Sequence, residues 1–462
     1  MLDSIFSKYV AQAPVAVMAR GLLENVLAPQ RIDAVFNDAA DRQYARQLAF
    51  STVVALLADV VVRARPSIHQ AYAARREQML VSVKSVYEKI NHCEPAVAAA
   101  LLSATAREME LIVRALGSML PEPLPGYRMK IADGNHFSAT HRRLGMLRGE
   151  GTCLPAQSLA VLDPQLQLML ALVPCEDAHI QERALVPDLL PWVEPRDLWI
   201  VDRNFCTTKM LFGIRRRQAF FLVRQHQQCL RWKEVGEFVS AGPDSAVAEQ
   251  PIEVWDADGS VMRLRRIRVR LDQPTRDGQR ELCFLTNLPP EVAAATIAEL
   301  YRCRWRIETA FQEATVDLCC EISALGTPGA AILVFAVAMV CFNAISVLKA
   351  ALRTQPVSPA NPAPAPEARL DRFSTCLMAD QIASIWPGME IVLPETFWTQ
   401  RFGSITTLQM ASELRTIAEQ ADVAAFQKRP PRKSPIRSPT PPRPGKHTAT
   451  ARKLELVKKH QT

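Results

Sequence analysis

One short segment, from Tyr301 to Thr315, gathers residue types that handle charged substrates. At about 100° per residue on a helix, Tyr301, Arg304, Glu308 and Thr315 fall on one face about 60° wide. An apolar stripe lies beside that face and is made of Ile307, Phe311, Ala314 and Leu318. An acid, a guanidinium and a phenol are therefore presented together beside a buried surface. The plainer alternative is a surface Arg304–Glu308 ion pair worth only a few tenths of a kcal/mol, but the alignment of Tyr301 favours function.

Two aspartates each follow an apolar run of strand length. Asp133 comes after Arg128-Met-Lys-Ile-Ala and Asp202 comes after Leu198-Trp-Ile-Val. A carboxylate at the end of a strand lies at a sheet edge, beside the mouth of a pocket. Taken alone, either aspartate is more often a turn or helix-cap residue. Two of them on sheet strands favour a functional site, because neighbouring strands can bring both to one place.

These segments together resemble the motifs of DDE transposases of the bacterial insertion-sequence-four type. The spacing Tyr-x2-Arg-x3-Glu at 301–308 is similar to that family's signature, and Asp133-Gly134-Asn135 looks like its first Asp motif. The segment Asp202-Arg203-Asn204-Phe205 resembles the second Asp motif, and the strand at 284–288 also fits. The resemblance covers roughly residues 125–350. It implies an RNase H-like α/β core with a β-rich insertion between the second Asp and the Glu.

The resemblance also implies a mechanism. Two Mg²⁺ ions, for which Mn²⁺ could substitute, would be held by Asp133 as the bridging ligand, Asp202 and Glu308. The reaction would be cleavage of double-stranded DNA at element ends, followed by attack of the 3′-hydroxyl on target DNA. Arg304 would hold phosphate, and Tyr301 would contact DNA or orient Glu308. The family signature continues with a Lys where Thr315 stands here, so this position can donate a hydrogen bond to phosphate but carries no charge.

Further basic residues are candidates for phosphate contacts. They are Arg142, Arg143, Arg203, Arg266, Arg268 and Arg270. The last three share one side of a strand by its period of two. A solvated surface is the alternative for each cluster. Trp232 and Trp255 either stack an extruded base, as in members of that family, or simply pack. The polar segment 176–182 either caps a helix or lies near the metals.

The basic character of the chain sits in its C-terminal tail. The net charge is +8, and residues 427–462 contain 11 of the 55 Lys and Arg residues but one of the 47 acidic residues. The remainder carries 55 − 11 = 44 positive and 47 − 1 = 46 negative charges, or −2. A folded body of that charge needs local basic patches to bind DNA.

The pattern along the chain predicts five regions. They are a helical N-terminal domain at 1–125 with possible DNA binding, a mixed α/β domain at 126–350 with a β-rich insertion at about 225–290, a Pro-rich linker at 351–368, a small helical segment at 369–426 and a disordered basic tail at 427–462. The resemblance makes the second of these the RNase H-like catalytic domain. Within it, residues 178–192 and 291–316 are each expected to form a helix, and Asp-Gly turns are expected at 258–259 and 277–278.

The apolar run at 330–342 is too short for a membrane span of about 20 residues and suits a core helix better. The 11 cysteines form no CxxC pair, which favours a reducing cytoplasm, here bacterial and nucleoid-associated. A homodimer is expected because two DNA ends must be paired. Two alternatives stay open: an RNase H-like nuclease without strand transfer, and a catalytically inactive DNA-binding protein derived from a transposase.

Overall fold

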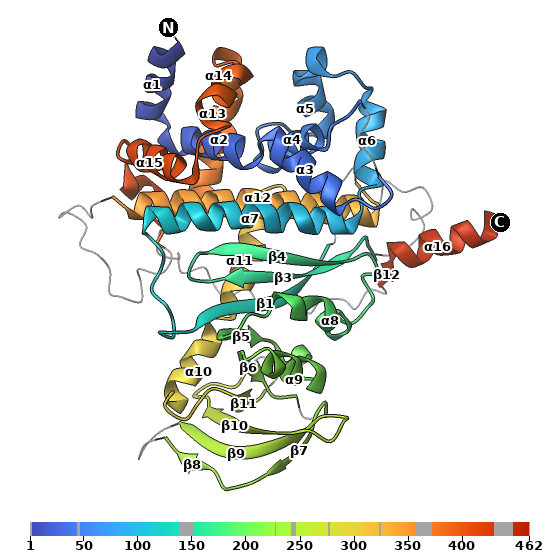
Figure 1. Ribbon diagram of the computed structural model, residues 1–462, viewed down its shortest axis with the longest axis vertical. Helices are drawn as coiled ribbons and strands as arrows, with labels where there is room; N and C mark the ends of the chain where they lie inside the picture. The colour runs from blue at the N-terminus through green and yellow to red at the C-terminus, as the bar shows by residue number, and fades with distance from the viewer. Residues whose placement is uncertain are drawn as a thin grey trace.

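The computed structural model places helices from both ends of the chain beside the edge of a mixed α/β sheet that is formed by β4 (Leu168–Cys175) (Figure 1). It describes residues 2–43, 47–137, 152–226, 228–241, 246–275, 278–322, 325–355, 372–428 and 447–461.

The core sheet has the strand order and directions of an RNase H-like fold. Its strands are β1 (Arg128–His136), β3 (Gln157–Asp163), β4 (Leu168–Cys175), β5 (Asp197–Val201) and β6 (Phe220–Arg224). The order is β4-β3-β1-β5-β6, with β1 antiparallel to β3 and parallel to β5. Strands β3 and β5 are buried throughout, as expected of strands covered on both faces. The predicted α/β core is confirmed.

The β-rich insertion continues this sheet. Its strands are β7 (Arg231–Glu234), β8 (Val239–Ser240), β9 (Val247–Trp255), β10 (Val261–Arg270) and β11 (Glu281–Thr286). Strand β11 pairs antiparallel with β6, so the strands of the core and of the insertion form one ten-stranded sheet. The turn between β9 and β10 contains the predicted Asp-Gly pair, with Gly259 at φ +86°, a conformation that favours glycine.

The described connections between the core strands contain only short elements. They are β2 (Thr152–Leu154), η4 (Glu182–Leu185), α8 (Val186–Leu189), η5 (Leu190–Trp192), η6 (Arg203–Phe205) and α9 (Thr208–Arg216). The single helix expected at 178–192 is instead a series of short turns, because Pro187 and Pro191 cannot continue the hydrogen-bond ladder.

Helices from the two chain ends pack into one layer above the sheet (Figure 1). The N-terminal ones are α1 (Leu2–Gln12), α2 (Pro14–Val26), α3 (Pro29–Ala39), α4 (Phe50–Val61), α5 (Ile68–Ala74), α6 (Val83–Asn91) and α7 (Pro95–Leu116). The C-terminal ones are α13 (Thr375–Val392), α14 (Glu395–Phe402) and α15 (Thr407–Ala418). All three C-terminal helices contact α2, and Asn25 donates hydrogen bonds to the carbonyls of Phe402 and Ile405. The segment expected as a separate helical unit is thus joined to the N-terminal helices.

Helix α12 (Pro328–Arg353) lies beside α7, and both helices pack between the other helices and strand β4. It is long and apolar enough to cross a membrane, but the whole apolar window is buried inside the protein. Its one buried amide, Asn343, accepts a hydrogen bond from the Met169 amide and donates one to the Met169 carbonyl, which fixes α12 on β4. These features are those of the predicted core helix.

The end of the tail differs from the expectation of disorder. Strand β12 (His447–Ala449) pairs in parallel with β2, and α16 (Thr450–Gln461) follows it. Good helix formers such as Ala, Arg, Lys, Leu and Glu replace the prolines in this last part of the chain, so a helix forms there. Residues 356–371 and 429–446, which hold most of the expected linker and the Pro-rich tail, lie outside the described ranges.

Candidate active site

The register between two parallel strands brings the two aspartates together. Ala132 of β1 lies opposite Val201 of β5, so Asp133 and Asp202 are the next residues on neighbouring strands. Asp202 follows the end of β5, as predicted. The expectation that Asp133 also ends a strand is wrong, because β1 continues to His136 through its pairing with β3. Asp133 lies instead where β5 stops, which leaves its side chain beside an open strand end.

The predicted single helix after residue 290 is two helices, α10 (Ala294–Arg302) and α11 (Trp305–Val316). At Cys303 and Arg304 the amides bond to the carbonyls three residues back, at 3.0 and 3.1 Å, instead of four. Such a tightened turn breaks the regular 100° spacing on which the calculated face depended. Tyr301 therefore belongs to α10, whereas Glu308 lies in the first turn of α11.

Arg304, at the junction of the two helices, joins two of the three acids. Its Nη1 lies 2.8 Å from Asp133 Oδ2 and its Nη2 lies 2.6 Å from Glu308 Oε1. Its side chain is 12% exposed, and its Nε is buried without a hydrogen-bond partner among the described residues. Asp133 and Glu308 thus meet at one guanidinium whose Nε remains available as a donor, and the strand register places Asp202 beside Asp133.

Tyr301 and Thr315 occupy different surroundings. The Tyr301 ring is buried and stacks against Phe284, with centroids 4.4 Å apart. Burial raises the pKa of its hydroxyl, and nearby Arg304 opposes that rise. These contacts fit a residue that orients Arg304 better than one that touches DNA. Thr315 is exposed, and its hydroxyl donates to the Phe311 carbonyl at 2.8 Å within its own helix.

A fourth carboxylate, Glu182, stands next to Asp133. A Cβ added to Gly134 would lie 2.0 Å from Glu182 Oε1, so only glycine lets the carboxylate approach β1. Asn204 donates to Glu182 Oε2 at 3.4 Å. The sequence offered two signals for this contact, the glycine after Asp133 and the acidic 176–182 segment. The sequence left two interpretations of that segment, a helix cap or a position near the metals. The position of Glu182 beside the aspartates agrees with the second.

This crowding perturbs Asp133. Burial raises the pKa of Asp133 from 3.8 to about 7. Arg304 and the Gly134 amide oppose the rise, while the carboxylates of Glu182 and Asp202 add to it. Conversely, the pKa of Arg304 is raised: burial lowers it, but Tyr301, Asp133 and Glu308 outweigh burial. The site therefore concentrates negative charge that a single guanidinium only partly neutralises.

The donor atoms of this site suit a hard divalent cation. Asp133, Asp202, Glu182 and Glu308 offer carboxylate oxygens, which Mg²⁺ and Mn²⁺ prefer. Across the described residues no cluster of three His, Cys, Asp or Glu side chains is already arranged around a metal position. In this arrangement Arg304 pairs with both Asp133 and Glu308. The residues fit a divalent ion once Arg304 releases Asp133.

A basic cavity of about 860 Å³ lies between the core and the insertion and reaches Arg203, the residue after Asp202. Its lining includes Arg203, Arg224, Arg266, Arg280 and Trp232. The Arg266 guanidinium lies 4.8 Å from the centroid of the Trp232 ring and bonds to Gln225 and Gln250, both at 2.9 Å. Positive charge beside an aromatic ring is an arrangement that suits a nucleic acid strand.

Three of the remaining sequence candidates lie together on one strand of the insertion. Arg266, Arg268 and Arg270 face the same side of β10, as the period of two predicted, and Arg268 lies over Phe238. Arg270 pairs with Glu281 at 3.2 Å. Trp255 lies beside Arg231 and Lys233, on the face of the sheet opposite to Arg266 and Trp232. Arg142 and Arg143 lie outside the described residues.

A second cavity of about 490 Å³ extends the first, because both are lined by His226. It also touches His136, His179 and Glu182, and so passes along the carboxylate side of the site. The two cavities together make an elongated depression across the ends of β1, β5 and β6.

Comparison with known proteins agrees with this picture. Residues 131–322 match the model of a family described as the transposase DDE domain. The matched segment begins on β1 and ends after α11, so it contains Asp133, Asp202, Glu308 and the insertion. The match supports a DDE transposase, a class that implies an enzyme acting on phosphodiester bonds.

One solved structure is similar in arrangement: a cryo-EM structure of the piggyBac transposase synaptic complex with hairpin DNA. It shares 9% identity with this chain, over 92% of this chain and 87% of that one, with a TM-score of 0.39. No curated protein matches the chain.

Proposed function

We propose that the chain is a transposase of the insertion-sequence-four type that cleaves DNA at element ends and joins the 3′-hydroxyl to target DNA. One observation carries the proposal: the β1–β5 register sets Asp133 beside Asp202, and Arg304 connects Asp133 to Glu308. The family match over residues 131–322 supports the DDE assignment.

Asp133, Asp202 and Glu308 are the residues that would together hold two Mg²⁺ ions. Bound there, the ions supply activation of the attacking hydroxyl and stabilisation of the leaving oxygen. Asp133 must be ionised to act as a ligand. Because its pKa is raised to about 7, occupancy of the site displaces a proton and is favoured above neutral pH.

Arg304 is the proposed phosphate-binding residue. Its two carboxylate partners are the proposed metal ligands, so its guanidinium becomes available to the substrate when those acids bind cations. The cavity lined by Arg203 and Arg266 is the proposed path of the DNA strand. A homodimer pairs the two element ends in this proposal, and the enzyme acts on DNA in the bacterial cytoplasm.

The test uses duplexes that carry the inverted repeats flanking the gene, incubated with Mg²⁺. Asp133→Ala, Asp202→Ala and Glu308→Ala should each abolish end cleavage while largely keeping DNA binding. Asp188→Ala is the matched control, because it removes an exposed acid from α8 of the same region and should cleave normally. Full cleavage by any one of the three site variants contradicts the assignment.

The same experiment separates the alternatives. Cleaved ends that never join a target indicate an RNase H-like nuclease without strand transfer. Specific DNA binding without cleavage in Mg²⁺ or Mn²⁺ indicates an inactive protein derived from a transposase.

A further inference from the structure

A second acid on the catalytic helix, Glu313, makes contacts that the chemistry described above does not use. Thr375 Oγ1 donates to its Oε2 at 2.5 Å, and Lys349 Nζ lies 3.4 Å from the same oxygen. Lys428 Nζ lies 3.3 Å from its Oε1. Lys349 belongs to α12, Thr375 begins α13, and Lys428 follows the short helical turn η8 (Val423–Phe426). One carboxylate therefore ties α11 to three segments far away in the sequence.

The contacts at Glu313 are mostly shielded from solvent. Its side chain is 15% exposed and that of Lys349 is 2% exposed, whereas Lys428 is 40% exposed. Removing one partner from a buried ion pair is strongly destabilising, because the other charge stays buried without compensation. The Glu313–Lys349 pair is therefore buried, the Thr375 hydroxyl is a second buried partner of Glu313, and Lys428 is its exposed partner.

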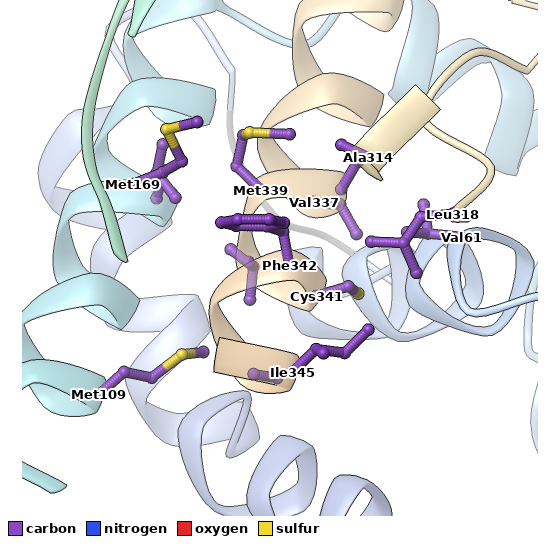
Figure 2. Packing of buried hydrophobic residues seen from close by; sticks show 14 of the residues in the cluster. Val61, Met109, Met169, Ala314, Leu318, Val337, Met339, Cys341, Phe342 and Ile345 are labelled. Atoms are coloured by element: carbon purple, nitrogen blue, oxygen red, sulfur yellow. The ribbon is translucent and has the colours of Figure 1, made fainter. Parts of the chain in front are cut away.

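The space around Glu313 is incompletely filled. A cavity of about 190 Å³ lies between α11 and α12, lined by Arg306, Thr309, Glu313 and Lys349 among others. Figure 2 shows the apolar contacts at this level, where Ala314 and Leu318 approach α12 and Val61 of α4. The buried residues Ile307, Ala310, Phe311 and Ala314 hold α11 in the core, and on the side of the cavity its remaining contacts with α12 and α13 include the polar ones of Glu313.

The tilt of α11 decides where Glu308 lies. Glu308 and Glu313 are five residues apart on one helix, a rise of about 7.5 Å. The tightened turn at Cys303 and Arg304 separates α11 from α10 and provides a pivot. A rotation about that turn would move Glu308 relative to Asp133 and Asp202, which are fixed in the sheet.

We infer that Glu313 is a positioning residue: with Thr375 and Lys428 it orients α11 so that Glu308 completes the divalent-cation site. The C-terminal segment 372–428 thereby takes part in the reaction without touching DNA or metal. This inference rests on the proposed function of the three acids.

The test is the double variant Thr375→Val, Lys428→Ala, which leaves the buried Glu313–Lys349 pair intact. The matched control is Arg401→Ala, which breaks a half-exposed pair with Glu413 in the same C-terminal helices, away from α11. Three properties are compared in full-length protein: end cleavage in Mg²⁺, binding of Tb³⁺ in the absence of DNA, and thermal melting. Tb³⁺ luminescence is excited through Trp305, which is 64% exposed and precedes Glu308 by three residues. Loss of the signal in Glu308→Gln assigns it to this site.

The expected result is cleavage about 10- to 100-fold slower than that of the wild type, because misplacement of a reacting group by about 1 Å has such an effect. The Tb³⁺ concentration for half-saturation should rise severalfold, with the melting temperature and DNA affinity close to those of the control. A higher Mg²⁺ concentration should restore part of the rate. A purely structural role would lower the melting temperature and leave Tb³⁺ half-saturation unchanged, and that result overturns the inference.

The outcomes also distinguish failure of the role of Glu313 from failure of the proposed function. An active wild type with an equally active double variant overturns the role of Glu313 alone. A wild type that neither cleaves DNA nor binds Tb³⁺ at Glu308 overturns the proposed function and this inference together.

Discussion

Substituting Asp133 with Asn should abolish cleavage and yet stabilise the metal-free protein above neutral pH. Asp133 is largely buried beside Glu182 and Asp202, and Arg304 is shared with Glu308. Asn keeps the shape of the side chain but does not ionise. The substitution therefore removes a charge that the fold accommodates only at a cost.

The sign of this change in stability follows from the pKa of Asp133. In the folded protein the pKa of Asp133 is raised to about 7 from 3.8. The native state therefore keeps a proton that the unfolded state loses, so the stability from this group is complete below pH 4 and is lost as pH rises through 7. At about 1.4 kcal/mol per pKa unit, the two units between pH 5 and 7 amount to at most about 3 kcal/mol.

The assay is urea unfolding of the wild type and Asp133→Asn in EDTA at pH 5, 6, 7 and 8. The difference between the free energies of unfolding, variant minus wild type, should increase as pH rises. It should level off above pH 7. Adding Mg²⁺ at pH 8 should then stabilise the wild type but not the variant, because only the wild type binds the ion. A difference between the two proteins that is constant from pH 5 to 8 would refute the reasoning.

Three further predictions test individual contacts. Arg266→Ala should make the slope of log K for DNA against log salt shallower by about 0.9, whereas Arg263→Ala, on the exposed opposite face and paired with Glu253, should leave the slope unchanged. Gly134→Ala should displace Glu182, slow cleavage and move the midpoint of its pH profile downward, because Asp133 then has one carboxylate fewer beside it; an unchanged profile contradicts the role of Glu182. Tyr301→Phe keeps the ring on Phe284 but removes the hydroxyl beside Arg304, so cleavage should fall while the melting temperature stays within a few degrees.

The sequence predicted those parts of the fold that local patterns determine. The apolar run 198–201 became β5, and the Asp-Gly pair at 258–259 became the turn between β9 and β10. The order of the motifs predicted the RNase H-like core. The helix carrying Glu308 was foreseen because its apolar stripe has a regular period.

Other features depend on contacts that no local pattern contains. The break at Cys303 and Arg304 follows no proline or glycine, and Arg304 there reaches Asp133 on a distant strand. The approach of Glu182 to Asp133 depends on a turn that the intervening strands place. The joining of both chain ends into one helical layer, and with it the contacts of Glu313, depends on pairs of residues separated by tens to hundreds of positions.

The most direct test of the central claim is anomalous diffraction from crystals of the protein grown with Mn²⁺ and a DNA end. The account predicts Mn²⁺ bound by carboxylate oxygens of Asp133, Asp202 and Glu308, with Arg304 released from Asp133 and turned to a phosphate. Mn²⁺ bound away from these three acids, with Arg304 still joining Asp133 to Glu308 in crystals whose DNA has been cleaved, would contradict it.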